Sequence, residues 1–137
     1  MTDISRTLGK HKKRNVCVMA LPIDVSDMAA ADTYELAILP TNVLITASAL
    51  IVIIPFDGTT PTIAVGFNGG AELLAATAID TSADTVAAGN GNLSKQTGPQ
   101  ITMDKLGTST VGKAVFLIEY IEYEQATGEL TNFIPAP

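Results

Sequence analysis

Short stretches of β-branched and other apolar residues, separated by turn residues, run along most of this chain. The longest covers residues 43–54 and is apolar at both odd and even positions. Such a run predicts a strand that is covered on both faces, by a second sheet or by a neighbouring subunit. Residues 113–123 alternate with a period of two, as a second long strand does. Shorter strands are predicted at residues 16–21, 34–39, 62–67, 101–103 and 130–134.

Turn residues divide these strands. Asp57–Gly58 predicts a tight hairpin between residues 43–54 and 62–67, and Asn68 with its two following glycines predicts another turn. Residues 79–100 predict a long exposed loop, with one short strand near Val86. Two segments stay open: 22–33 is one helical turn or a loop, and 72–78 is a helix or, by its length and surroundings, a strand. The pattern predicts an all-β fold, an antiparallel β-sandwich or jelly roll.

Charge divides the chain into two parts. The first 14 residues hold five basic residues and one acidic residue, a net charge of +4 with His11 neutral. The other 123 residues hold three lysines and thirteen carboxylates, a net charge of −10. We therefore expect a flexible basic arm over residues 1–15 and one sandwich domain over residues 16–137. The basic arm residues are Arg6, Lys10, Lys12, Lys13 and Arg14.

The composition bounds the surface of that domain. The chain has 137 residues, of which 47% are hydrophobic and 16% are charged. Soluble domains have roughly 25% charged residues. Either the remaining surface is neutral and rich in Thr, Ala and Gly, or part of it is buried against other subunits. We favour burial, because a polar surface does not by itself account for so few charges.

Nucleophilic catalysis requires a base near the nucleophile. The only histidine is His11, which lies in the arm, where we expect no fixed pocket. The only cysteine is Cys17, and its apolar neighbours predict a buried, inert thiol. Neither residue forms a recognisable catalytic pair, so we expect no catalytic residue, and the chain is predicted not to be an enzyme.

Carboxylates are the other candidates for chemistry. Glu119, Glu122 and Glu124 gather at the end of one predicted strand, which is typical of a solvated rim. Asp80 and Asp84 flank the long loop, but they lack the dense oxygen ligands and glycine turn of a calcium site. We therefore expect no metal site and no cofactor.

The basic arm remains as the main signal for a partner. Duplex DNA binding by its basic residues would be strongly salt-dependent. However, a domain of charge −10 repels DNA, and the arm has no aromatic residue to stack on bases. We expect a protein partner, either another protein or a neighbouring copy of this chain, while a solvated tail is the plain alternative. Because residues 43–54 are too few to span a bilayer as a helix, we expect no membrane contact.

The order of these features resembles the β-sandwich head decoration, or cement, proteins of tailed bacteriophages. The resemblance covers residues 32–123. It is carried by residues 32–40 (DTYELAILP), the strand 43–54, the Asp57–Gly58 turn, residues 65–74 (VGFNGGAELL), the Gly/Asn loop and the strand 115–123. It implies a symmetric homo-oligomer, with a trimer favoured, that binds the major capsid protein or another virion protein.

The resemblance also implies a location in the virion. Because the sequence shows no secretory signal and no stretch long enough to span a bilayer, we expect assembly in the host cytoplasm. Similar sandwiches occur in tail, baseplate and fibre-attachment proteins, so those structural roles stay open. A carbohydrate- or receptor-binding module that uses residues 79–100 is a further alternative. This loop has no aromatic residue for stacking on sugars, which argues against that alternative.

Overall fold

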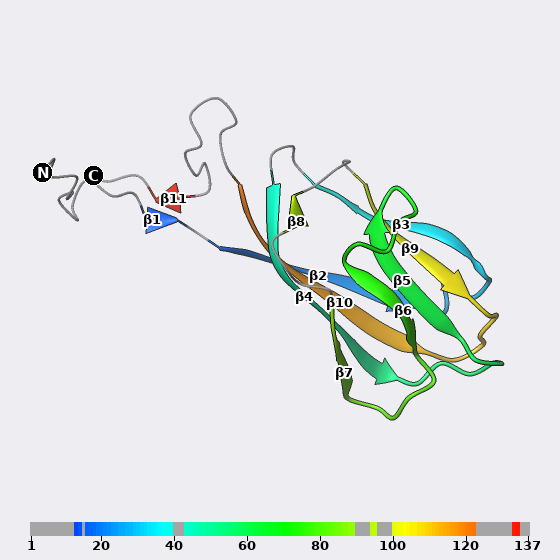
Figure 1. The fold of residues 1–137 in the computed structure, drawn as a ribbon. Coiled ribbons are helices and arrows are strands. Elements are labelled where there is room, and N and C mark those ends of the chain that lie inside the picture. Colours follow the sequence, from blue (N-terminus) through cyan, green and yellow to red (C-terminus); the bar gives the residue numbers. More distant parts are fainter. Residues whose placement is uncertain are drawn as a thin grey trace, which may run out of the picture.

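Two antiparallel sheets stacked face to face contain nine of the strands (Figure 1). The computed structural model describes residues 13–14, 16–39, 43–89, 94–95, 100–122 and 133–134. Sheet I has the order β2 (Cys17–Asp24), β10 (Lys113–Glu122), β4 (Val43–Ile54), β7 (Thr85–Ala88), and β8 (Ser94–Lys95) also pairs with β4. Sheet II has the order β3 (Asp32–Ile38), β9 (Gln100–Leu106), β5 (Thr62–Phe67), β6 (Leu74–Ala78).

The strand order is that of a jelly roll. The chain passes repeatedly from one sheet to the other, so β2, β4, β7 and β10 form one layer, while β3, β5, β6 and β9 form the second. This confirms the predicted all-β sandwich. A separate two-stranded ribbon joins β1 (Lys13–Arg14) to β11 (Phe133–Ile134) in antiparallel register. In Figure 1 this ribbon lies beside the sandwich and belongs to neither sheet.

The core lies between the two sheets. On β10, Ala114, Phe116 and Ile118 alternate with half-buried residues and are fully buried. They face apolar residues of sheet II such as Ile63 and Met103, which are also fully buried. The period-two pattern that predicted strand 113–123 therefore separates the core face from the outer face.

A β-bulge explains why residues 43–54 are apolar at both odd and even positions. Glu119 of β10 is paired with Ala47 and Tyr120 with Ile45, which leaves Thr46 without a partner residue. The extra residue exchanges the two faces of the strand. The core positions are therefore odd before the bulge, at Val43 and Ile45, and even after it, at Leu50 and Val52. Within one chain only the core face of the strand is covered, and Ala47 on the other face is exposed. Cover of that face by a neighbouring subunit, the other predicted alternative, stays a prediction.

The predicted hairpin at Asp57–Gly58 is wrong. Strands β4 and β5 lie in different sheets, and residues 55–61 cross between them. Phe56 is buried, and the Asp57 carboxylate accepts hydrogen bonds from the β9–β10 connection. Gly58 has φ +109°, and a Cβ there would collide with the Thr108 carbonyl oxygen. Asp57 and Gly58 therefore fix a contact between the β4–β5 and β9–β10 connections, and they do not reverse the chain.

Several shorter predictions are confirmed. Asn68 (φ 50°) and Gly69 (φ 89°) form the tight turn of the β5–β6 hairpin. The open segment 72–78 contains strand β6, and the short strand near Val86 is β7. Residues 22–33 hold the end of β2, a turn and the start of β3, with no helix. Pro22 fits into β2 because β2 is an edge strand of sheet I.

Candidate interaction surface

The outer face of sheet I is apolar across its four main strands. Residues there alternate with the core residues of the same strands, and the strand registers arrange them in three cross-strand rows. Row 1 is Pro22, Val115, Ile51 and Val86. Row 2 is Ala20, Leu117, Ala49 and Ala88. Row 3 is Val18, Glu119 and Ala47. We call these three rows the sheet I face.

Much of the sheet I face is open to solvent. Val18 is 68% exposed and Val86 is 63% exposed, and the three alanines at positions 20, 47 and 88 are exposed as well. Four strands about 4.8 Å apart and three rows about 6.8 Å apart cover on the order of 400 Å² of sheet. The largest apolar patch of a monomer is typically about 300–600 Å² and is often functional. The sheet I face is therefore a candidate interaction surface.

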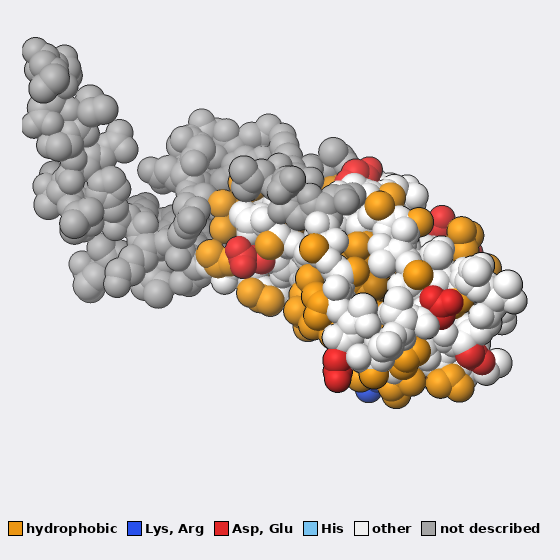
Figure 2. Space-filling model, turned by 60° about the horizontal axis from the view of Figure 1, so that its bottom comes forward, with side chains coloured by type: hydrophobic (Ala, Val, Ile, Leu, Met, Phe, Trp, Pro, Cys, Tyr) orange, Lys and Arg blue, Asp and Glu red, His pale blue; other side chains and the backbone are white. Residues whose placement is uncertain are grey.

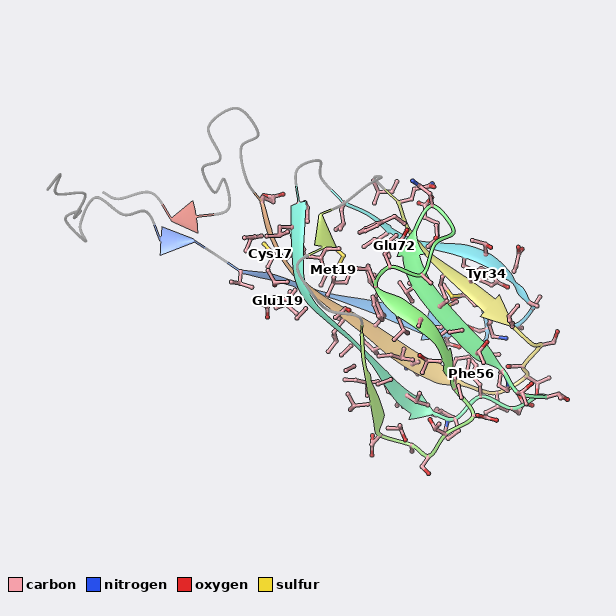
Figure 3. The ribbon with its side chains drawn as sticks, viewed as in Figure 1. Cys17, Met19, Tyr34, Phe56, Glu72 and Glu119 are labelled. Carbon is pink, nitrogen blue, oxygen red and sulfur yellow. The ribbon has the colours of Figure 1, made fainter. Side chains whose placement is uncertain are left out.

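The central strand β10 places one charge at each end of this surface. Its outward residues are, in order, Lys113, Val115, Leu117 and Glu119. The bulge fixes Glu119, because the Thr46 hydroxyl is 2.9 Å from the Glu119 Oε1 and 3.2 Å from its carbonyl oxygen. Figure 3 shows Glu119 and Phe56 at opposite ends of the sandwich.

Lys113 has an acidic neighbour on the edge strand. It is paired with Asp24 of β2. The backbone N–H of Ser26 donates to Asp24 at 2.9 Å and is the main reason that the pKa of Asp24 lies below its usual value, to which the charge of Lys113 adds. Figure 2 shows several acidic side chains and very little basic surface on the described part of the side turned forward, with hydrophobic side chains among them.

The structure places only part of the basic arm. Arg6, Lys10 and Lys12 lie outside the described residues. Lys13 and Arg14 form β1, paired with Ile134 and Phe133 respectively. The backbone at the end of the arm is thus paired with the end of the chain. The role of the five basic side chains stays a prediction.

Only some of the candidates for catalysis lie in the part of the chain that the structure describes. Cys17 is half-buried, less than predicted, and is paired with Tyr120 of β10. Burial is the main reason that the pKa of Tyr120 lies above its usual value, and the electrostatic effect of Cys17 adds to it. His11 and Glu124 lie outside the described residues. Within the part of the chain that the structure describes, no three His, Cys, Asp or Glu residues are grouped so as to hold a metal ion.

Two charged residues hold one end of the sandwich: Lys105, which the sequence did not single out, and Asp57, which was predicted only as part of a hairpin turn. Lys105 is fully buried, and its Nζ donates to the Ala29 carbonyl at 3.1 Å, to the Gly107 carbonyl at 2.5 Å and to the Ser109 hydroxyl at 3.3 Å. Desolvation lowers the pKa of Lys105, and the charge of Asp57 opposes that shift. These contacts join the β2–β3 and β9–β10 connections, a structural role.

Asp57 makes the second set of contacts at this end. Its Oδ1 accepts from the backbone N–H groups of Thr110 at 2.6 Å and Val111 at 2.9 Å, and its Oδ2 accepts from the Thr110 hydroxyl at 2.5 Å. The Thr110 side chain contributes most to lowering the pKa of Asp57 to about 2, and the two N–H groups add to it. The carboxylate is thus held charged between two connections.

Comparison with solved structures gives the same fold in phage capsids. A chain of the acid-stable capsid of Helicobacter pylori bacteriophage KHP30 is 12% identical, with a TM-score of 0.60 over 80% of this chain and 90% of that one. A chain of the cyanophage Pam1 capsid is 17% identical, with a TM-score of 0.58 over 98% and 93%. A chain of the Ralstonia phage GP4 capsid is 22% identical, with a TM-score of 0.58 over 91% and 92%.

At these identities the similarity establishes the fold. No protein-family model matches the chain. No curated protein sequence matches it either. Among the described residues, no helix is long and apolar enough to cross a membrane.

Proposed function

We propose that this chain is a non-enzymatic structural protein of a bacteriophage virion, of the head decoration or cement type. The observation that carries the proposal is the fold that it shares with chains of three phage capsids. Each of those chains is matched over at least 90% of its length. The similarity therefore extends over whole small capsid components and does not stop at one domain of a larger protein.

The proposed mechanism is stabilisation by mass action. A subunit that binds the assembled shell, and not the free shell protein, shifts the equilibrium toward the assembled state. At a free concentration of 100 times Kd, one such site contributes about 2.7 kcal/mol. The rigid sandwich suits this role, because a preordered domain loses little conformational entropy when it binds.

The basic arm supplies the electrostatic part of the attachment. Arg6, Lys10, Lys12, Lys13 and Arg14 would contact acidic groups of the major capsid protein or another virion protein. Attraction between exposed charges weakens as salt screens them over about 8–10 Å. The sheet I face would serve contacts between copies of the chain. The phage resemblance favours a trimeric homo-oligomer, without naming the surface that the trimer would use.

The test is binding to assembled shells. Expanded shells of the virion's major capsid protein are incubated with three proteins. These are the full chain, a chain lacking residues 2–14, and a variant in which the five basic residues of the arm are replaced by Gln. Pelleting measures binding, and light scattering during heating measures shell disruption. The full chain should bind shells but not free shell protein, and it should raise the disruption temperature.

The variants separate the arm from the general role. Both should keep the sandwich fold, and both should bind shells less tightly, with a weaker dependence on salt. If both variants bind like the full chain, the role of the arm is wrong. If the full chain binds tails and not shells, a tail or baseplate role replaces the decoration role.

A further inference from the structure

We propose that two copies of this chain pair through their sheet I faces, related by a two-fold axis that passes over β10 between Val115 and Leu117. The proposal deepens the proposed function, because it names the surface by which copies contact one another. It rests on the assignment of the chain as an assembly protein, but its test needs no shell.

The sequence of β10 is antisymmetric about that axis. Its outward residues read cation, apolar, apolar, anion: Lys113, Val115, Leu117 and Glu119. When two such strands lie antiparallel, Val115 of one copy faces Leu117 of the other. Lys113 of each copy then faces Glu119 of the other, so one rotation creates two opposite-charge contacts. A two-fold contact is self-complementary in this sense, since each residue pair occurs twice.

The neighbouring strands fit the same rotation. The rotation places row 1 of one copy over row 2 of the other. Each strand of sheet I then lies over the same strand of the second copy. Ile51 on β4 then faces Ala49 of the second copy, and Val86 on β7 faces Ala88 of the second copy. On β4 and β7, large side chains therefore lie opposite alanines. Interdigitation of this kind lets two sheets pack about 10 Å apart with their strands within about 30° of each other.

Charge favours a second copy over an unrelated partner. Residues 15–137 carry a net charge of −10, so copies repel one another over most of their surface. The sheet I face holds one charged residue, Glu119, and Lys113 and Asp24 lie at its border. Asp24 is engaged locally by the Ser26 N–H, which leaves Lys113 as the cation that faces Glu119. A strongly charged partner would find no matching charge here.

The size of the surface sets the strength of the pairing. About 400 Å² of sheet per copy, or about 800 Å² in total, is smaller than a stable specific interface and falls in the range of weak, transient ones. We therefore expect a micromolar dimer in solution, strengthened wherever a lattice holds copies close together. A trimer would use another surface, so the two contacts are compatible in one shell.

A charge exchange tests the axis. In Lys113→Glu, both opposite-charge contacts of a homodimer become Glu–Glu, and in Glu119→Lys both become Lys–Lys. Each variant alone should dimerise at least about tenfold more weakly than the wild type. An equimolar mixture forms heterodimers in which both contacts are again of opposite charge. Its affinity should return to within about threefold of wild type.

Sedimentation velocity up to millimolar concentration measures these affinities, and circular dichroism verifies each fold. Asp80→Lys changes the net charge as Glu119→Lys does, but Asp80 lies in the β6–β7 connection, outside the three rows; it should dimerise like wild type or better. If a charge reversal unfolds the chain, Lys113→Gln and Glu119→Gln replace the reversals, and each should weaken the dimer by a smaller factor.

Three results would overturn the pairing: a wild type that stays monomeric, single variants that associate like wild type, or a mixture no tighter than its components. None of these results bears on shell binding by the arm, which the pelleting experiment tests. The pairing of copies and the decoration role can therefore fail independently.

Discussion

The two sheets of this sandwich share one backbone plan but have opposite outer faces. On sheet II, polar side chains bond to one another: the Thr33 hydroxyl donates to Asp104 at 3.3 Å, and the Gln100 amide donates to Glu35. On sheet I, ten of the eleven residues in the three rows are apolar, and Glu119 is the exception. Since an antiparallel sheet needs only one buried face to be stable, the second apolar face of sheet I has no use in the isolated fold.

This difference indicates where the chain meets protein and where it meets water. Single exposed apolar residues such as Ile38 on sheet II, 64% exposed, are normal on any surface. A continuous array over four strands is not, because each residue adds to the same patch. The sequence shows a low charge content only as an average over the chain. In the structure, the uncharged apolar surface is gathered on one face, the sheet I face.

The largest expected effect separates the core from the sheet I face on a single strand. Phe116→Ala should lower the free energy of unfolding by about 3–5 kcal/mol, because Phe116 is fully buried between the sheets. Leu117→Ala, one residue further, should cost about 1 kcal/mol or less in stability. It should nevertheless weaken dimerisation about tenfold or more, as a residue at the centre of an interface does.

Chemical denaturation and sedimentation of the two variants test this separation. Equal losses of stability would mean that the sheet I face is folded against the rest of the chain. That result would contradict its assignment as an interaction surface.

A matched pair of charges compares the two outer faces directly. Ala49 on β4 and Ala64 on β5 are both half-buried and lie on central strands of sheets I and II. Ala49→Arg should weaken dimerisation by at least about 100-fold, because it buries an unpaired charge in the contact. Ala64→Arg should leave dimerisation unchanged, because Ala64 lies on sheet II and outside the sheet I face. Its neighbour across the strands is Asp104, whose charge is opposite to that of the new arginine. Analytical ultracentrifugation of both variants decides the comparison, and equal effects would contradict it.

The sequence was sufficient to predict local structure. Residues 43–54 and 113–123 were predicted as strands because their β-branched and alternating patterns are local properties, and they are β4 and β10. The Asn68 turn was predictable for the same reason, since positive φ is a preference of the residues themselves. An all-β fold follows from these strands and turns.

The relation between strands was not predictable in the same way. Asp57–Gly58 looked like a hairpin turn, but the Asp57 carboxylate binds Thr110, more than 50 residues later. Lys105 is buried because its acceptors include the carbonyl of Ala29, from another connection. The apolar face of sheet I also needed the registers, because the bulge at Thr46 changes which residues of β4 point outward.

A smaller effect is expected on the polar face. Thr102 is buried on sheet II, and its hydroxyl oxygen accepts a hydrogen bond from the Gly69 N–H at 2.6 Å. Thr102→Val keeps the shape and removes the acceptor, so we expect a loss of about 1 kcal/mol in unfolding free energy. Thr33→Val, at an exposed site, should lose less. Denaturant titration measures both, and a change in dimerisation by either variant would contradict the division between the faces.

The smallest expected effect is confined to acid and concerns the end at which the chain crosses between the sheets. Hydrogen bonds from Thr110 and Val111 lower the pKa of Asp57 from 3.8 to about 2. A depressed carboxyl pKa contributes stability that is fully present above the unfolded value and is lost as pH falls through the folded one. The Asp57 contribution should therefore be constant above about pH 4 and disappear toward pH 2.

Asp57→Asn tests this directly, because the amide does not titrate. The difference in melting temperature between wild type and Asp57→Asn should be constant from pH 7 to pH 5 and should narrow below pH 4. Thr110→Val removes the hydroxyl donor but keeps the backbone N–H, so it should show a reduced form of the same narrowing. A difference that is independent of pH would mean that Asp57 is not held charged between the two connections. Neither variant should change dimerisation, because Asp57 lies outside the three rows of the sheet I face.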